Sequence, residues 1–163
     1  MEHIKRIKRE LAYKGSILEF YKDTMVTPDG KVTYWDHIEH KGAAAVVPVL
    51  DDGRIVLVRQ YRNSPDEEPT ELAAIRELEE ETGYKAERKN VKKLISVYTA
   101  VAFCNEIIDI YVADKLIRTC QNLDDEESIN VEIYTLDEIK RMIFDETIRD
   151  SKTVSAMMAY SDM

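Results

Sequence analysis

Apolar and polar residues alternate along much of the first 40 residues of the chain. The alternation is clearest in residues 17–26 (ILEFYKDTMV) and 31–40 (KVTYWDHIEH), and a Pro-Asp-Gly turn at 28–30 lies between these two stretches. A period of two is typical of β-strands, and the Pro-Asp-Gly sequence favours a turn. The pattern therefore predicts an N-terminal region of β-strands, residues 1–40, that contains a hairpin.

The next two apolar runs are nearly continuous rather than alternating. They cover residues 43–50 (AAAVVPVL) and 54–62 (RIVLVRQYR), and an Asp-Asp-Gly turn at 51–53 joins them as a second pair. Continuous apolar runs of this length are typical of strands covered on both faces, and the glycine can supply the positive φ angle of a tight turn. Further strands are predicted at 94–101 (LISVYTAV) and 106–116 (EIIDIYVADKL).

Three segments show features of helices. The first is predicted over residues 67–83, with Pro69 in its first turn and Gly83 placed to end it. The others are 135–144 (TLDEIKRMIF), with Thr135 as N-cap, and 151–160 (SKTVSAMMAY), with Ser151 or Asp150 as N-cap. Together with the strands, these helices predict an α+β fold whose main domain, residues 41–163, packs a mixed sheet against helices.

The composition is that of an ordinary globular protein with a strong negative charge. The 163 residues are 44% hydrophobic and 34% charged, with a formal net charge of −9 and a sequence pI near 4.9. A chain of this length can form one domain with a substantial core. The negative charge would repel a phosphate backbone, so no nucleic acid is expected as a partner. An acidic protein that handles phosphates must recruit cations.

The sequence contains no feature of a membrane or secreted protein. No apolar run is long enough to span a bilayer, and the charged start MEHIKRIKRE has no hydrophobic signal core behind it. Cys104 and Cys120 lack C-x-x-C spacing and suit a reducing compartment. The three histidines, at 3, 37 and 40, are a poor set for a zinc site. We therefore expect a cytoplasmic protein that does not bind membranes.

The stretch ELAAIRELEEETGY, residues 71–84, contains five glutamates. On a helix, Glu77, Glu80 and Glu81 would converge on one patch, because side chains three and four residues apart share a face. Their repulsion costs only about a few tenths of a kcal/mol per exposed pair. A cluster retained against it still suggests a compensating hard cation such as Mg²⁺. Helical spacing alone also permits a solvated acidic face, in which Arg76 pairs with Glu68 or Glu80.

The order of these residues resembles the signature of the Nudix hydrolases, G-x5-E-x7-R-E-U-x-E-E-x-G-U, in which U is a bulky apolar residue. Eight of its nine specified positions are matched, by Glu68, Arg76-Glu77-Leu78, Glu80-Glu81 and Gly83-Tyr84. The resemblance implies the Nudix fold, a mixed β-sheet sandwiched between helices. It also implies that Glu77 and Glu81 bind metal ions, that Glu80 contributes directly or through water, and that Arg76 orients these carboxylates for catalysis.

Two further stretches resemble the ADP-ribose pyrophosphatase branch of this family, RQYRN at 59–63 and QNLDDEESINVE at 121–132. This resemblance implies hydrolysis of the diphosphate bond of a nucleoside diphosphate sugar with Mg²⁺ or Mn²⁺ as cofactor. ADP-ribose, the best match, would give AMP and ribose 5-phosphate. The alternatives are another nucleotide sugar, a dinucleotide, or a non-catalytic module that senses ADP-ribose-like ligands.

The same resemblance supplies candidate residues outside the glutamate helix. Glu127 aligns best with the loop glutamate that activates water, and Glu126 is the alternative one residue earlier. The substrate-binding candidates are Trp35 for the adenine, Arg59 and Arg62 for the diphosphate, and Glu106. Each has an ordinary alternative, because a single tryptophan can belong to the core and the charged residues can simply be solvated.

The chain departs from the family pattern at two places. Arg62 stands where the signature requires glycine, and the strand and glycine loop expected between Asn63 and Ser64 are missing. Either this strand is truly deleted, or a mobile segment has been omitted from the sequence. Omission is favoured, because deletion would leave neighbouring backbone groups unpaired. Val101 also replaces the proline that usually marks the ADP-ribose branch, which makes selectivity for ADP-ribose less secure than family membership.

Aromatic side chains in the N-terminal region predict a partner subunit. The strands that precede the core carry Tyr13, Phe20, Tyr21 and Trp35, which would be exposed unless something covers them. Burial of each contributes roughly 1.5–3 kcal/mol, so several could hold an obligate interface. Because the branch commonly dimerises through this region, the resemblance implies a homodimer whose N-terminal hairpins cross to the partner and help build both active sites.

Overall fold

The computed structural model describes residues 3–65, 67–124 and 127–163. The chain forms two compact units. The N-terminal unit contains the residues up to Gly42 together with Tyr98–Ile107, and the larger unit contains Ala43–Val97 and Ile108–Met163. The N-terminal unit therefore includes a segment that lies far along the chain from its strands. No helix in the described ranges is long and apolar enough to cross a membrane.

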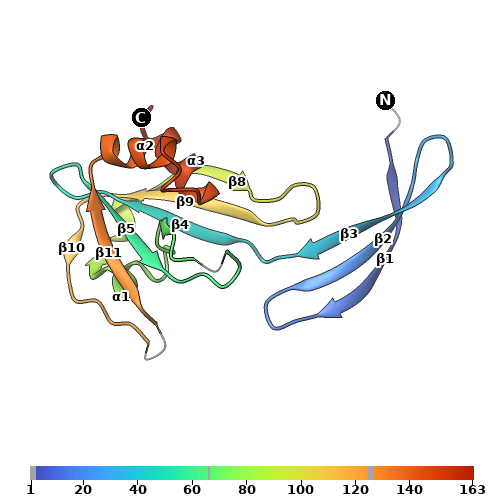
Figure 1. The fold of residues 1–163 in the computed structure, drawn as a ribbon, viewed down its shortest axis with the longest axis horizontal. Helices are drawn as coiled ribbons and strands as arrows, with labels where there is room; N and C mark the ends of the chain where they lie inside the picture. The colour runs from blue at the N-terminus through green and yellow to red at the C-terminus, as the bar shows by residue number, and fades with distance from the viewer. Residues whose placement is uncertain (1–2, 66, 125–126) are drawn as a thin grey trace. The chain divides into compact units, whose positions relative to one another are not determined.

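Three antiparallel strands form the sheet of the N-terminal unit (Figure 1). They are β1 (Lys5–Lys14), β2 (Glu19–Val26) and β3 (Val32–Glu39). The predicted hairpin is confirmed as β2 and β3, which pair from Glu19↔Glu39 to Val26↔Val32. Nine of the ten residues of β1 are exposed, so this strand has no alternation of buried and exposed positions. Among the described residues of this unit, Met25 is the only buried hydrophobic side chain.

The larger unit combines two three-stranded sheets with a two-stranded ribbon. Its longer strands are β4 (Ala43–Pro48), β5 (Ile55–Gln60), β8 (Val91–Tyr98), β9 (Ile107–Ala113) and β11 (Ile129–Tyr134). The short elements are β6 (Thr70–Glu71), β7 (Tyr84–Lys85), the 3₁₀ turn η1 (Arg88–Asn90) and β10 (Ile117–Arg118). The strand orders are β4-β9-β8, β11-β5-β6 and β10-β7. Strands β4 and β9 are parallel, whereas β5 and β11 are antiparallel, so the predicted mixed α+β architecture is confirmed.

The Asp-Asp-Gly turn at 51–53 joins β4 to β5, but the two strands do not continue as one ladder. Leu50 N–H donates to the Arg54 carbonyl at 2.8 Å, and Val49 forms a single bridge with Ile55. Beyond this point β4 pairs with β9, and β5 pairs with β11 and β6. Successive residues of both strands are buried, at 45–48 in β4 and at 55–58 in β5, so both faces of each strand are covered, which explains why both apolar runs are nearly continuous.

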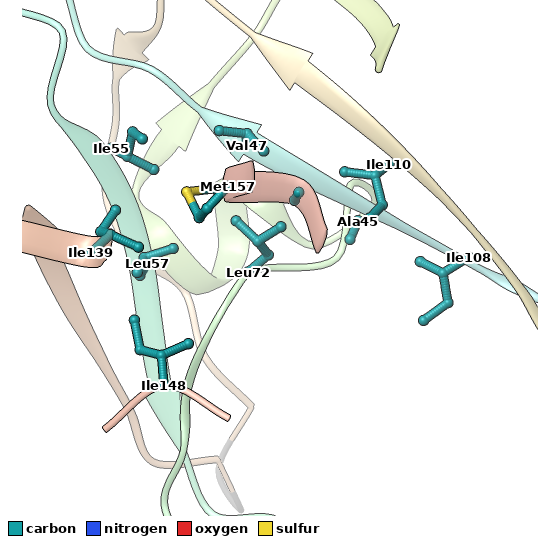
Figure 2. Packing of buried hydrophobic residues seen from close by; sticks show 11 residues of the cluster. Ala45, Val47, Ile55, Leu57, Leu72, Ile108, Ile110, Ile139, Ile148 and Met157 are labelled. Carbon is teal, nitrogen blue, oxygen red and sulfur yellow. The ribbon is translucent and has the colours of Figure 1, made fainter. Parts of the chain in front are cut away.

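The main hydrophobic cluster joins the strands of the larger unit to its C-terminal helices. Figure 2 shows side chains from β4 (Ala45, Val47), β5 (Ile55, Leu57) and β9 (Ile108, Ile110) beside Leu72, Ile139, Ile148 and Met157. Helices α2 (Leu136–Phe144) and α3 (Ser151–Tyr160) begin where the sequence predicts. Thr135 caps α2 in a capping box with Glu138, and Asp150, rather than Ser151, caps α3.

The helix predicted over residues 67–83 is much shorter in the structure. Helix α1 spans only Leu78–Thr82, and Gly83 ends it with a φ of 68°. Thr70–Glu71 instead form β6 beside β5, and the Ala73 carbonyl accepts the Val46 N–H at 3.2 Å. Most of these residues are good helix formers, but propensity differences of at most about 1 kcal/mol per residue are smaller than the cost of strand backbone left without partners. Sheet pairing therefore overrides the helical pattern.

This arrangement removes the physical argument against a deleted strand. Residues 70–74 pair first with β5 and then with β4, where Ala74 bridges Ala45 and Ile75 N–H donates to the Ala44 carbonyl at 3.2 Å. The backbone groups next to the missing strand thus have partners from within this chain. The preference for an omitted segment, which rested on unpaired backbone, loses its basis.

Candidate active site

The short helix α1 places one glutamate inside the protein. Glu77 is the N-cap, and Glu81 N–H donates to the Glu77 carbonyl at 2.8 Å. Leu78, Glu81 and Thr82 form the buried side of the helix. Because Leu78 packs into an apolar cluster with Val46 and Ala113, its burial fixes the rotation of α1. That rotation carries Glu81 inward with it.

Glu81 is a buried carboxylate with one oxygen that has no hydrogen-bond partner among the described residues. Only 5% of the Glu81 surface is exposed. Its Oε2 atom accepts no hydrogen bond from any described residue. Burial and the negative charge of Glu77 raise its pKa to about 7, Glu127 and Glu71 add to the increase, and Arg62 opposes it. A buried acid surrounded by acids is electrostatically unfavourable and marks a site for a cation.

The donor chemistry at Glu81 fits a hard divalent cation. The partnerless Oε2 is a carboxylate oxygen, the ligand type that Mg²⁺ and Mn²⁺ prefer, and the neighbouring carboxylates would favour positive charge. In the described parts of the chain, however, no three His, Cys, Asp or Glu side chains are close enough together to hold a metal. Glu81 and Glu77 thus place negative charge here without forming such a trio.

Two further charged residues of the motif face solvent, one on α1 and one just before it. Glu80 and Arg76 are exposed. Among the residues that the structure describes, Arg76 forms no ion pair with Glu68 or Glu80. The pairing considered from the sequence needed one continuous helix, and residue 68 precedes β6 instead. The metal roles of Glu77, Glu80 and Glu81 and the orienting role of Arg76 stay predictions.

A buried ion-pair network lies beside the acidic cluster. Glu71, on β6, is only 3% exposed, and one carboxylate oxygen accepts the Arg62 Nε at 2.6 Å. The other accepts the ammonium of Lys152, from the first turn of α3. Lys152 also pairs with Asp150 at 3.0 Å. Sequence reasoning missed Glu71 and Lys152, because they are separated by 81 positions and belong to no motif.

The two arginines predicted to bind diphosphate are both held by carboxylates. Arg62 pairs with Glu71, and Arg59 Nε donates to Glu132 at 2.8 Å. Thr70 Oγ1 also donates to Glu132, at 2.9 Å. Burial alone would raise the pKa of Glu132, but the hydrogen bonds from Arg59 and Thr70 hold it below its ordinary value. Arg59 is thus anchored, whereas the Arg62 side chain remains 48% exposed.

The loop before β11 carries the predicted general base. Glu127 is exposed, its N–H donates to the Asp124 carbonyl at 2.9 Å, and its carboxylate accepts the Asp124 N–H at 3.2 Å. Its charge contributes to the raised pKa of Glu81, which places the two acids in one electrostatic environment. Glu126, the alternative base, lies outside the described residues.

Two predicted substrate-binding residues belong to the N-terminal unit. Trp35 is 48% exposed and pairs across the sheet with Asp23, which Arg9 holds through two hydrogen bonds of 2.7 Å. Glu106 accepts a hydrogen bond from Thr99 at 2.8 Å and lies 3.1 Å from His40 Nδ1. Trp35 is therefore not a core residue, and the roles of both side chains toward substrate stay predictions.

A family model described as the NUDIX domain matches residues 39–156. The chain belongs to the Nudix family. An ADP-ribose pyrophosphatase of Bacillus subtilis (strain 168) is 32% identical to this Nudix chain, over 94% of it and 90% of the relative. A methanol dehydrogenase activator of Bacillus methanolicus is 34% identical, over the same shares of both chains. These matches confirm the resemblance to the family and to its ADP-ribose pyrophosphatase branch, and this chain is a Nudix hydrolase.

A solved structure confirms the Nudix fold. The crystal structure of an ADP compounds hydrolase superposes with a TM-score of 0.83, at 18% identity, covering 99% of this chain and 94% of the other. The alignment with the Bacillus subtilis relative spans 169 positions, more than the 163 residues of this Nudix chain. The relative therefore has residues without a counterpart in this chain.

Proposed function

We propose that this Nudix hydrolase cleaves the diphosphate bond of a nucleoside diphosphate sugar, with ADP-ribose giving AMP and ribose 5-phosphate. The observation that carries the proposal is the buried Glu81 carboxylate on the family's motif helix, because its Oε2 lacks a hydrogen-bond partner among the described residues and its pKa is raised by burial and by neighbouring acids. The choice of substrate is supported by the relatives described as ADP-ribose pyrophosphatases, from Bacillus subtilis and Mycobacterium tuberculosis.

In this proposal Glu81 and Glu77 hold the divalent cation, with Glu80 as a further ligand directly or through water. A bound Mg²⁺ or Mn²⁺ ion would neutralise diphosphate charge and lower the pKa of water. Glu127 takes the proton from the attacking water as general base. Arg62 leaves Glu71 to form charge-assisted hydrogen bonds with phosphate oxygens. Arg76 orients the glutamates, and Arg59 supports the site through Glu132.

A nucleotide screen tests the proposal. The purified protein is incubated with ADP-ribose, other nucleotide sugars and NAD, each with Mg²⁺, with Mn²⁺ or with EDTA, and products are separated by chromatography. We expect AMP and ribose 5-phosphate from ADP-ribose only when a metal is present, and no turnover by Glu81→Gln. Absence of hydrolysis of every nucleotide sugar, with folded protein and metal present, would refute it.

Two second candidates each follow from a specific observation. The methanol dehydrogenase activator at 34% identity favours an activating role toward a dehydrogenase. Faster methanol oxidation by an added dehydrogenase would favour it. The shortened helix α1 and the absence of a metal-ready trio in the described ranges favour a non-catalytic sensor. That reading requires ADP-ribose binding without turnover.

We further propose that the N-terminal unit forms a homodimer interface. Strand β1 lies at the edge of its sheet and exposes Ile7 (63%), Leu11 (53%) and Tyr13 (68%). An exposed edge strand with apolar side chains is a surface that another chain can cover. Light scattering at micromolar concentration should give twice the chain mass of 18.9 kDa. A fully active monomer would contradict a shared active site.

A further inference from the structure

The segment that leads into the acidic loop packs tightly against the end of α1. Thr119 N–H donates to the Gly83 carbonyl at 2.8 Å, and Asn122 N–H donates to the Glu80 carbonyl at 2.9 Å. A Cβ atom at Gly83 would lie 3.0 Å from the Gln121 backbone nitrogen. Only glycine fits this contact with a positive φ angle. Residues 119–122 are therefore fixed against the helix end by the main chain.

Gln121 adds a side-chain link between the helix and the far side of the loop. Its Nε2 donates to the Glu81 carbonyl at 2.7 Å and to the Ile129 carbonyl at 3.0 Å. One amide nitrogen thus uses both of its hydrogens on two backbone acceptors. The first acceptor belongs to the buried glutamate of α1, and the second belongs to the first residue of β11, two positions after Glu127.

We propose that Gln121 is a positioning residue that sets the distance between Glu127 and Glu81. The inference rests on the proposed function, in which Glu127 is the general base and Glu81 holds the metal. Glu127 lies in the chain between Asn122, which is bound to the helix end, and Ile129, which begins β11. By joining the two ends, the Gln121 amide closes this loop onto the metal-binding helix.

The physical need for such a link follows from the exposure of Glu127. Among the described residues, the hydrogen bonds of Glu127 are the reciprocal ones with Asp124. Those contacts shape the loop but do not attach it to α1. A general base must lie within hydrogen-bond reach of the water that it deprotonates, and a displacement of about 1 Å can cost about a hundredfold in rate. Main-chain hydrogen bonds hold the residues before Glu127 at α1, and the Gln121 amide adds the link to Ile129, which follows Glu127.

The test is the variant Gln121→Met, which keeps a long unbranched side chain but removes both donors. We expect kcat for the cleaved nucleotide sugar to fall by about ten- to a hundredfold, with KM changed by less than about threefold, because the base acts in the transition state. The matched control is Asn122→Ala, since Asn122 contacts the helix through its main chain. It should retain kcat.

A double-mutant cycle with Glu127→Gln separates positioning from general stabilisation. If Gln121 acts through Glu127, then Gln121→Met has no further effect on kcat once Glu127 is glutamine. Equal losses in both backgrounds, or an unchanged kcat in Gln121→Met, would overturn the inference. If Glu127→Gln alone leaves kcat intact, the proposed base has failed instead, and the inference falls with it.

A second variant covers a loss of folding in Gln121→Met. Gln121→Asn keeps an amide donor but is one methylene shorter, so it cannot reach both carbonyls. Its thermal unfolding should resemble that of the parent protein, and its kcat should fall as in Gln121→Met. A parent-like kcat in folded Gln121→Asn would show that bridging both carbonyls is unnecessary and would refute the positioning role.

Discussion

At the scale of single residues, Glu81 shows how a site can oppose the stability of its own fold. Burial and the charges of Glu77, Glu127 and Glu71 hold its pKa near 7, above the ordinary value of 4.5. The folded protein therefore binds this proton more tightly than the unfolded chain does. The resulting stabilisation is complete below pH 4.5 and is lost as the pH rises to about 7.

Glu81→Gln should consequently stabilise the metal-free protein at high pH while abolishing turnover. The difference between a pKa of 4.5 and about 7 corresponds to about 3 kcal/mol, and glutamine avoids this loss because it carries no charge. Urea unfolding in EDTA at pH 5 and pH 8 measures the effect. The free energy of unfolding of Glu81→Gln should increase relative to that of the parent protein as the pH rises. The exposed variant Glu80→Gln should show no such increase.

Addition of Mg²⁺ provides the complementary measurement on the same residue. An ion that binds the folded state stabilises it by mass action. At pH 8, Mg²⁺ should raise the unfolding midpoint of the parent protein and leave that of Glu81→Gln unchanged. Equal shifts in both proteins would place the ion elsewhere.

Glu127→Gln should separate catalysis from binding. A general base acts in the transition state, so kcat should fall by about a hundredfold or more, whereas KM should change little. Steady-state kinetics with ADP-ribose and Mg²⁺ measure both constants. If Glu126→Gln has the larger effect, the catalytic loop glutamate is one residue earlier.

At the scale of elements, the sequence predicted those whose signals are local. The hairpin of β2 and β3 follows from alternation, and α2 and α3 follow from caps within their own turns. The start of α1 could not be predicted in this way, because the backbone of residues 70–74 pairs with β5 and β4, which lie elsewhere in the sequence. Local helix propensity is a weak guide to the structure of a segment whose backbone can pair with the edge of a sheet.

The Glu71 network should be a strong element-level contact between β6 and α3. Lys152→Met leaves the buried Glu71 carboxylate with only Arg62, and we expect a loss of about 3 kcal/mol in urea unfolding. Lys14→Met, which breaks the exposed pair with Glu19, should have only a slight effect. Replacing Glu71 and Lys152 together by methionine should recover part of the loss. Equal effects of the two lysine variants would contradict this account.

At the scale of the whole molecule, the site candidates are distributed over both units. Glu77, Glu81 and Glu127 belong to the larger unit, whereas Trp35 and Glu106 belong to the N-terminal unit. The motif suggested Glu77 and Glu81 as candidates from residue order, and the resemblance of the loop suggested Glu127. The sequence did not reveal Glu71, Lys152 and Gln121, because their contacts exist only after distant segments have folded together.

Trp35→Ala tests whether the N-terminal unit contributes to substrate binding. Stacking on the adenine would persist equally in the ground and transition states, so KM should rise at least several-fold with kcat nearly unchanged. Tyr34→Ala is a matched control, since Tyr34 is an exposed aromatic neighbour on β3. The Lys22 Nζ lies 4.3 Å from the centroid of its ring. An unchanged KM in Trp35→Ala would remove this residue from the site.

The sparse burial in the N-terminal unit has a consequence for how the molecule opens. With Met25 as the only buried hydrophobic side chain among its described residues, this sheet has little to hold it closed, so local unfolding should begin there. Amide hydrogens of β1 to β3 should exchange with deuterium faster than those of β4 and β5. If a second copy covers the sheet, their exchange should slow as the protein concentration increases, and the amides would report the assembly.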